Sequence, residues 1–362
     1  MTNNTVLYIG GFQLPDKNAA AQRVVGIAKG LRLLGYNVVF LNSLTKCDNR
    51  NIKCKDYFGF TCYEFQREMK WDYLISGKTT LSLIKSIKPA TIIAYNYPAL
   101  SLNRIRVFCR KNNIKLYADC TEWYLAEGRG VVYRLIKNVD TFYRMRVVHK
   151  KLDGIIAISK YLYNYYCNCV NTVLIPPTID IDDSKWAVDV QKEADISSFI
   201  YAGSPSLLKE DLDYIVKTID HVSIDYNVEL NVVGITDKQF IKMYNWKEQI
   251  PTSVRFIGRV NHIDVVKMVS NSDWSIILRG NNRVVNAGFP TKVVEAISCG
   301  TPVIVNDFSN IKDYLDNSNS IVIKDYSELE NAIITAINRK MNVNKGLFDY
   351  RNYLMELNHL LS

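Results

Sequence analysis

The strongest constraint on the fold is a repeated alternation of short apolar segments, rich in β-branched residues, with longer segments of helical periodicity. Most of the apolar segments are continuous, as expected for strands buried on both faces of a parallel sheet. This βαβ repetition predicts an α/β fold with doubly wound sheets, with helices such as 20–34 and 211–222. The expected strands are 6–9, 37–41, 91–95, 115–118 and 154–158, followed by 198–201, 229–233, 254–257, 274–278, 302–305 and 320–323.

The expected strands form two series, separated by a segment over 175–194 that contains two prolines, several acidic residues and no strong periodicity. A chain of 362 residues is long enough for two domains. We therefore predict a Rossmann-like domain over 1–178, a second one over 179–345, and a helical segment over 346–362 that packs back on the first. Two such domains facing each other across a cleft would bind ligands at the carboxyl ends of their strands.

The charge is unevenly distributed along the chain. Residues 1–180 carry 26 Lys and Arg against 12 Asp and Glu, whereas residues 181–362 carry 19 against 24. The basic half therefore indicates an anionic partner, and nucleic acid, a membrane surface and a phosphorylated substrate are all compatible with it.

Several classes of protein are disfavoured. The first residues lack the basic start and apolar stretch of a signal peptide, and no apolar run approaches the ~20 residues needed to span a bilayer. The eight cysteines are scattered without paired CxxC spacing, which favours reduced thiols in a cytoplasmic protein over a zinc site or disulfides. The four histidines are far apart and no DxD motif follows a strand, so no metal site and no cofactor are expected.

The first expected strand ends in Gly10 and Gly11, and a helix follows after a loop. Glycines at this point allow the backbone to approach a ligand, and the helix start presents free N–H groups to anions. A tight turn without a ligand is the alternative. The chain contains neither GxGxxG nor GxxxxGK[ST], so it has no dinucleotide fingerprint and no P-loop.

The segment GFPTKVVEAISCG at 288–300 predicts a short helix between two loops. Lys292 and Glu295 are three residues apart and therefore share one helical face. The backbone N–H groups near the helix start can bind an anion. The alternative is a surface Lys–Glu pair, worth only roughly 0.2–0.5 kcal/mol.

Four segments together resemble the retaining, family-4-like GT-B glycosyltransferases of capsule and surface-polysaccharide biosynthesis. Segment 8–41 has Arg, Ala, Leu, Gly and Val at the spacing of the family's first helix, segments 199–219 and 256–260 are similar to parts of its donor domain, and 288–305 is similar to its donor-site helix and following strand. The first-helix positions are Arg23, Ala28, Leu31, Gly35 and Val38.

The resemblance implies a site for a nucleotide-sugar donor. It implies that Glu295 accepts hydrogen bonds from the ribose, that Lys209 and Lys292 contact phosphate, and that the helix start near 288–291 meets the diphosphate. The full set of expected donor-binding residues is Gly10, Gly11, Gly203, Lys209, Arg259, Arg279, Gly288, Phe289, Pro290, Thr291, Lys292 and Glu295.

The chain departs from the family pattern at two positions. Ala287 stands where these enzymes usually carry a second glutamate near the sugar, and Ser204 stands where an arginine usually follows Gly203. Arg279 and Lys292 are the expected substitutes for the missing arginine.

In the first half, YADCTEWY at 117–124 places Asp119 and Glu122 at the carboxyl end of an expected strand. The DxxEW pattern is similar to one in polysaccharide transferases, and it predicts that both carboxylates act in catalysis by orienting donor or acceptor hydroxyls. The alternative is that Asp119 caps a helix, with Glu122 three residues later. No side-chain nucleophile is expected, since cations and helix N–H groups can stabilise the leaving phosphate.

Segment 128–152 interleaves seven Lys and Arg with apolar and aromatic residues, and the basic segment 104–111 adds to it. This composition is typical of a surface that binds an anionic membrane. An ordinary solvated helix face is the alternative.

These patterns lead to one expectation about function. The chain is expected to transfer a sugar, with retention, from a UDP- or GDP-sugar to a hydroxyl of a lipid-diphosphate-linked glycan, in capsule or O-antigen assembly at the inner face of the membrane. The first alternative is a nucleotide-sugar 2-epimerase on the same fold, which needs an additional cluster of acids and histidine. A non-catalytic or nucleic-acid-binding protein is disfavoured, because no RRM, helix-turn-helix or zinc signature is present.

Overall fold

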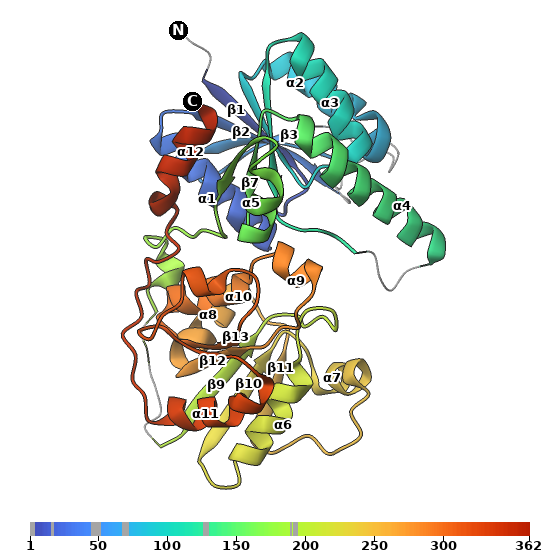
Figure 1. Ribbon diagram of the computed structural model, residues 1–362. Coiled ribbons are helices and arrows are strands. Elements are labelled where there is room, and N and C mark those ends of the chain that lie inside the picture. Colours follow the sequence, from blue (N-terminus) through green and yellow to red (C-terminus); the bar gives the residue numbers. More distant parts are fainter. Residues whose placement is uncertain are drawn as a thin grey trace. The chain divides into compact units, whose positions relative to one another are not determined.

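The computed structural model describes residues 4–15, 18–44, 52–66, 72–125, 130–188, 190 and 195–362. The chain divides into two compact units (Figure 1). The first comprises Met1–Ile179 together with Tyr350–Ser362, and the second comprises Asp180–Asp349. These limits lie close to the expected boundaries at 178 and 345, and the end of the chain belongs to the first unit.

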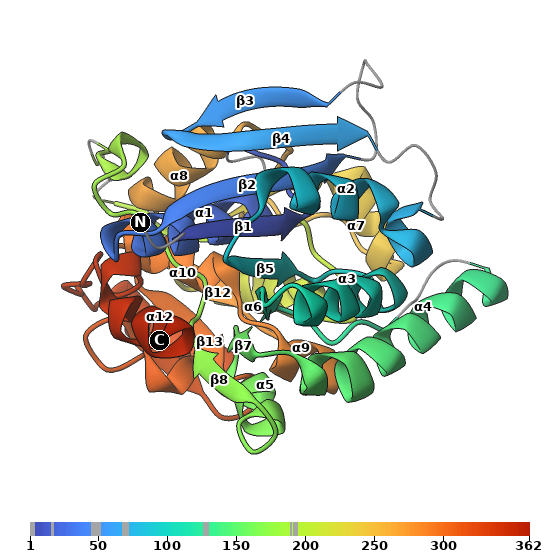
Figure 2. The same cartoon turned by 90° about the horizontal axis from the view of Figure 1, so that it is seen from above.

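The first unit contains an eight-stranded sheet in the order β3-β4-β2-β1-β5-β6-β7-β8. Every neighbouring pair is parallel except β3 and β4, which form an antiparallel hairpin at one edge (Figure 2). The strands are β1 Thr5–Gly10, β2 Asn37–Leu44, β3 Lys53–Tyr57, β4 Phe60–Gln66, β5 Thr91–Tyr95, β6 Lys115–Cys120, β7 Gly154–Ala157 and β8 Asn171–Leu174.

Helices connect these parallel strands, as crossover connections require. The side chain of Asn18 accepts a hydrogen bond from the Ala21 amide and thereby starts α1. The helices are α1 Ala19–Leu33, α2 Lys78–Ile87, α3 Ala99–Lys111, α4 Val131–Tyr143, α5 Lys160–Tyr166 and α12 Leu354–Leu361, with short π or 3₁₀ turns at Asp72–Ser76, Arg144–Val148, His149–Lys151 and Tyr350–Tyr353.

The C-terminal helix α12 packs against α1. A Cβ on Gly30 would lie 2.7 Å from Cδ1 of Leu357, so glycine allows the two helices to approach closely. Leu357 and Leu360 belong to the same buried cluster as Val24 and Ile27 of α1. The helix expected over 346–362 is shorter than predicted, because regular α-helix begins only at Leu354.

The second unit contains a parallel sheet in the order β11-β10-β9-β12-β13-β14. Its core includes Trp274, whose indole Nε1 donates a hydrogen bond to the carbonyl of Ala336 (3.0 Å). The strands are β9 Ser197–Ala202, β10 Val228–Val233, β11 Val254–Gly258, β12 Trp274–Ile277, β13 Val303–Asn306 and β14 Ser320–Ile323. The helices are α6 Leu212–Val222, α7 Asp237–Tyr244, α8 His262–Asn271, α9 Arg283–Ala287, α10 Thr291–Cys299 and α11 Leu329–Ile337, with 3₁₀ turns at Ser184–Trp186, Ile311–Asp313 and Tyr326–Glu328.

All eleven expected strands are present, nine of them with shifted ends. The sequence patterns do not predict β3, β4 and β8. Strand β3 is exposed over most of its length and β8 begins with the polar pair Asn171 and Thr172, so neither has the continuous apolar run of a buried strand. Among the described residues, no helix is both long enough and apolar enough to cross a membrane.

Shortening Leu357 to alanine should destabilise the first unit by about 2–5 kcal/mol, because it leaves a cavity between α12 and α1. Urea denaturation should show the loss, and hydrogen exchange should be faster in α1. Met355→Ala is the matched control, since Met355 is 81% exposed on the same helix. Equal stability of the two variants would contradict the assignment of α12 to this core.

Candidate functional site

The second unit has its topological switch point between β9 and β12. The chain continues from β9 to β10 on one side, while β12 is the neighbour on the other side. Ligands of doubly wound sheets bind at such points, beyond the carboxyl ends of the strands. Gly203 follows β9 and Arg279 lies just after β12, so these two expected residues flank the switch point.

Two glycines shape the loop after β9. Gly203 has φ +133° and Gly234 has φ +106°, a region that side chains rarely adopt. A Cβ on Gly203 would lie 2.4 Å from Cε of Lys292, and one on Gly234 would lie 2.6 Å from the Gly203 carbonyl. Glycine at position 203 is therefore required for the aliphatic part of the Lys292 side chain to pack against the backbone after β9.

Glu210 connects three segments of the site. Its Oε1 lies 2.7 Å from Nη2 of Arg279 and 3.0 Å from Nζ of Lys292, and its Oε2 accepts a hydrogen bond from the Ser206 amide (3.0 Å). The carboxylate is only 3% exposed. Burial opposes its ionisation, but the charges of Lys292 and Arg279 outweigh burial and hold the pKa of Glu210 below its ordinary value.

Lys292 is the titratable cation of this cluster. Burial lowers the pKa of its ammonium to about 8, and the attraction of Glu210 offsets only part of that effect. Its Nζ lies 5.0 Å from the centroid of the Tyr201 ring. Lys292 can therefore change its charge near neutral pH, which an exposed lysine does not do.

Arg279 is held by its backbone as well as by its side chain. Its amide donates to Oδ1 of Asn306 (2.9 Å), and its carbonyl accepts from Nδ2 of Asn306 (2.7 Å). One donor of the guanidinium is unsatisfied. Its Nε is buried and has no hydrogen-bond partner among the described residues. An anion arriving at this edge would find that donor unused.

The segment around the start of α10 is fixed by its side chains. The ring of Phe289 is 6% exposed and packs edge-on against Tyr314 and Phe348, while the Gly288 carbonyl accepts a hydrogen bond from Ser309 Oγ (2.8 Å). Pro290 is the N-cap of α10. The first amides of a helix have no partner within it, so this start can bind an anion beside Lys292.

Glu295 lies one turn further along α10 and is 20% exposed. Its Oε1 is 3.2 Å from Nε2 of His262, the first residue of α8. The second oxygen of Glu295 can accept hydrogen bonds from a ligand while His262 orients the carboxylate. Sequence reasoning did not single out His262, because it lies 33 residues from its partner and no motif joins them.

The sequence patterns also did not predict Glu210 and Asn306 as part of this site. Glu210 is buried and forms a β-bridge with Arg279, and no local sequence pattern indicates this pairing. Lys209 itself is half-buried and Arg259 is exposed in the loop after β11. The described contacts connect neither of these two side chains to Glu210, so their phosphate-binding role stays a prediction.

The two departures from the family pattern have a clear structural setting. Ala287 is the last residue of α9 and is fully buried, so its position offers no side chain to a ligand. Ser204 is exposed in the loop after β9. The cations near the switch point are instead Arg279 and Lys292.

In the first unit, Gly10 ends β1 at the switch point between β1 and β5. A Cβ on Gly10 would lie 2.8 Å from the Phe12 ring and 3.0 Å from Cβ of Tyr95. Close packing thus explains Gly10, which favours the tight-turn alternative for this residue. Gly11 is half-buried, and its ligand-binding role stays a prediction.

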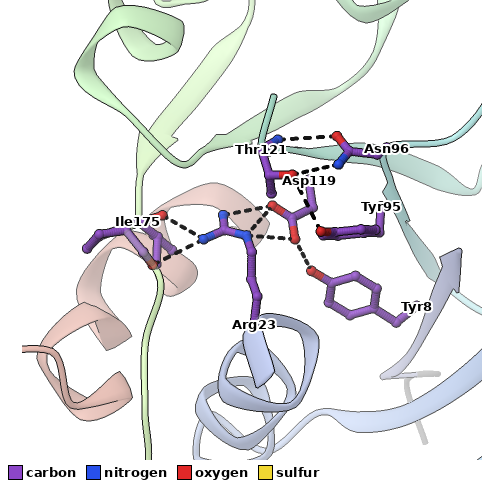
Figure 3. A network of polar contacts seen from close by, with 8 residues as sticks. Tyr8, Arg23, Tyr95, Asn96, Asp119, Thr121 and Ile175 are labelled. Carbon is purple, nitrogen blue, oxygen red and sulfur yellow. Dashed lines mark hydrogen bonds and ion pairs between the residues drawn. The ribbon is translucent and has the colours of Figure 1, made fainter. Parts of the chain in front are cut away.

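Asp119 lies in a buried network rather than on an open surface (Figure 3). Its carboxylate is 2.7 Å from Nη2 of Arg23, accepts a second bond from Arg23 Nε (2.8 Å) and accepts a third from the Tyr8 hydroxyl (2.6 Å). The side chain is 0% exposed. The prediction that Asp119 contacts sugar hydroxyls is therefore wrong for this arrangement, because all of its acceptor positions serve Arg23 and Tyr8.

The network extends from Asp119 to neighbouring segments. Nη1 of Arg23 donates to the carbonyls of Ile175 and Pro176, where the chain leaves the first sheet. Asp119 caps no helix either, since 121–125 are irregular in structure. Asp119 is thus a positioning residue that holds α1, β1 and β6 together.

Glu122 is half-buried in the irregular segment after β6. Burial raises the pKa of the neighbouring Tyr124, and the charge of Glu122 raises it further. Among the described contacts, Asp119 binds Arg23, whereas no arginine binds Glu122. Its catalytic role stays a prediction.

The comparisons with known proteins address the class of this protein. Residues 194–347 match the family model described as glycosyl transferases group 1. The match covers most of the second unit. Comparison with curated proteins gives no match.

Several solved structures share the fold over nearly the whole chain. The lipopolysaccharide outer core galactosyltransferase WaaB superposes with a TM-score of 0.67 at 12% identity, covering 99% of each chain. The Anabaena protein HepE, solved in complex with UDP-glucose, has a TM-score of 0.62 at 13% identity, again covering 99% of each chain. The UDP-GlcNAc 2-epimerase of Methanocaldococcus jannaschii has a TM-score of 0.60 at 12% identity and 99% coverage of both.

These findings confirm two predictions. The fold is that of the GT-B glycosyltransferases, with two α/β units built on parallel sheets. Together with the family match, the shared fold identifies the protein as a glycosyltransferase. These similarities do not identify the sugar, the acceptor or the pathway, which stay predictions.

Replacing Asp119 with asparagine should lower the free energy of unfolding by about 3–5 kcal/mol, since it leaves the buried charge of Arg23 without its counterion. Chemical denaturation measures the loss. Asp153→Asn is the matched control, because the ion pair between Asp153 and Lys115 is half exposed and should contribute less than about 1 kcal/mol. Similar losses in both variants would refute a special structural role for Asp119.

Proposed function

We propose that the protein transfers a sugar from a nucleotide-sugar donor to a hydroxyl of a lipid-diphosphate-linked glycan, with retention of configuration. The observation that carries this proposal is the arrangement on α10. Within one helix, an N-terminus and the Lys292 ammonium precede a partly exposed carboxylate, Glu295, by one turn. Such an order suits a ligand with a diphosphate at one end and a ribose diol at the other.

The chemistry follows from these groups. The bond between the sugar carbon and the donor phosphate breaks, a bond to the acceptor oxygen forms, and the acceptor hydroxyl releases its proton. Negative charge develops on the leaving nucleoside diphosphate. Lys292, Arg279 and the first amides of α10 are placed to stabilise that charge without a metal ion.

Retention is proposed because the sequence resembles the retaining family-4-like glycosyltransferases, in which no side-chain nucleophile is expected. Surface-polysaccharide assembly, such as that of capsule or O-antigen, is proposed as the pathway, and peripheral binding at the inner face of the membrane as the location. The basic character of residues 1–180 supports an anionic, lipid-diphosphate acceptor.

Replacing Glu295 with alanine should weaken donor binding at least tenfold, because charge-assisted hydrogen bonds to the ribose are worth about 1.5–3 kcal/mol each. A thermal-shift screen of UDP- and GDP-sugars first identifies the donor, since a ligand at 100 times its Kd stabilises by roughly 2.7 kcal/mol. Calorimetry then compares the wild type, Glu295→Ala and the control Glu248→Ala, whose glutamate is exposed in the same unit.

Unchanged affinity of Glu295→Ala would refute the site. Product analysis tests the reaction itself with the donor that the screen identifies. A glycosyltransferase releases nucleoside diphosphate when the acceptor is present, whereas conversion of UDP-GlcNAc to its 2-epimer without an acceptor would establish the epimerase alternative.

Donor affinity should fall as the pH rises above about 8. The pKa of Lys292 is about 8 in the free protein, so the ammonium is present below that pH and is lost above it. Binding of the anionic diphosphate favours the protonated amine, and the complex should therefore take up protons between about pH 8 and 9. Calorimetry in buffers of different ionisation enthalpy measures that uptake.

Lys292→Arg is the matched variant for this test, because a guanidinium keeps its charge throughout the range. Its donor binding should show no proton uptake above pH 8. Equal uptake by the wild type and the arginine variant would show that Lys292 is not the group that titrates.

A further inference from the structure

Helix α4 presents its apolar face to solvent. Surface helices normally bury that face against the core. Here Val132 is 71% exposed, Leu135 is 64% exposed and Val139 is 59% exposed. These positions recur at intervals of three or four residues, so they form one stripe along the helix. We call this stripe the outward face of α4, and it comprises Val131, Val132, Leu135, Ile136, Val139 and Phe142.

The opposite side of α4 is anchored to the first unit. The Asp140 carboxylate accepts a hydrogen bond from the amide of Ala99 at the start of α3 (2.8 Å), and Thr141 is 3% exposed. Directly after the helix, Arg144 is 1% exposed and donates to the Asn96 carbonyl (3.1 Å). Rotating α4 to bury its outward face would break these contacts, so the exposure is built into the unit.

Cations surround this face. Helix α3, which lies beside α4 in Figures 1 and 2, carries four Lys and Arg and no acid. Residues 131–151 carry five Lys and Arg besides the buried Arg144, against the single Asp140. Arg104 and Arg134 are exposed, and the Arg146 guanidinium lies 4.9 Å from the centroid of the Phe142 ring. The one acid of these segments is occupied at the start of α3.

We propose that α4 docks the protein on an anionic lipid surface, with its outward face among the acyl chains and the cations of α3 and α4 at the headgroups. Helices that bind at the membrane interface combine an apolar face with Lys and Arg at its margins. This inference rests on the proposed lipid-linked acceptor for its use in the reaction. It specifies which element meets the membrane.

The charge distribution favours lipid over other occupants. A second copy of this chain on the same face would bring two sets of cations together without acids to pair them. Nucleic acid would be attracted to the cations but would leave the six apolar side chains in water. An anionic bilayer satisfies both parts of the surface at once.

The test uses flotation of the full chain with vesicles and involves no sugar transfer. The wild type should bind vesicles that contain phosphatidylglycerol, bind pure phosphatidylcholine weakly, and lose affinity as salt rises. Leu135→Asp should reduce binding at least tenfold, because it places a charge where a leucine entered the acyl region. Leu33→Asp is the matched control, since Leu33 is a leucine of the same unit, 57% exposed on α1, and it should bind within twofold of the wild type.

Further variants test whether loss of vesicle binding arises from the outward face of α4 and its neighbouring cations. Val132→Asp repeats the test at a second exposed position, and circular dichroism checks that both variants are folded. Arg104→Gln with Arg134→Gln should weaken binding to anionic vesicles by about fivefold for each cation removed, without affecting neutral ones. Equal vesicle binding by the wild type and both Asp variants would overturn the proposal.

A different result would identify another occupant. If the wild type ignores vesicles but forms a dimer in sedimentation velocity, and Leu135→Asp is monomeric, the outward face is an interface between copies and the proposal is wrong. Absence of sugar transfer with intact vesicle binding would count against the proposed function alone, so the two failures are distinguishable.

Discussion

Each unit of this protein contains a buried carboxylate that is enclosed by cations. In the first unit Arg23 binds Asp119, and in the second Arg279 and Lys292 share Glu210. A buried charge without such partners would cost several kcal/mol, so neither carboxylate can lose its partners without disturbing the fold around it. Both pairs lie at the carboxyl ends of parallel strands, where the loops that form ligand sites begin. The pairing therefore fixes those loops before any ligand is present.

In the second unit, the ion pairs of Glu210 have a chemical consequence. Glu210 holds the two cations in place but also neutralises part of their charge. A diphosphate bound as proposed would compete with Glu210 for Lys292, whose pKa is lowered by burial. The buried Nε of Arg279 has no hydrogen-bond partner among the described residues, and the Glu295 side chain is 20% exposed. Contacts within the unit thus hold this cluster in place.

In the first unit, tertiary contacts determine which face of α4 is exposed. The amphipathic pattern of α4 predicts two faces but not which of them meets the protein. The contacts of Asp140, Thr141 and Arg144 decide that the polar side is attached and the apolar side is free. Contacts with other parts of the fold therefore determine which face of this amphipathic helix is exposed.

The sequence by itself determined the βαβ order, the eleven long apolar strands, the position of α10 and the residues Lys292 and Glu295, because periodicity, glycines and helix starts are local properties. It did not indicate the edge strands β3 and β8, whose residues are largely exposed or polar. Only the tertiary structure decided that Asp119 is enclosed by Arg23, that Glu210 bridges Arg279 and Lys292, and that His262 contacts Glu295. These contacts join residues 33 to 96 positions apart, and their energies arise from burial that exists only after the sheets have formed.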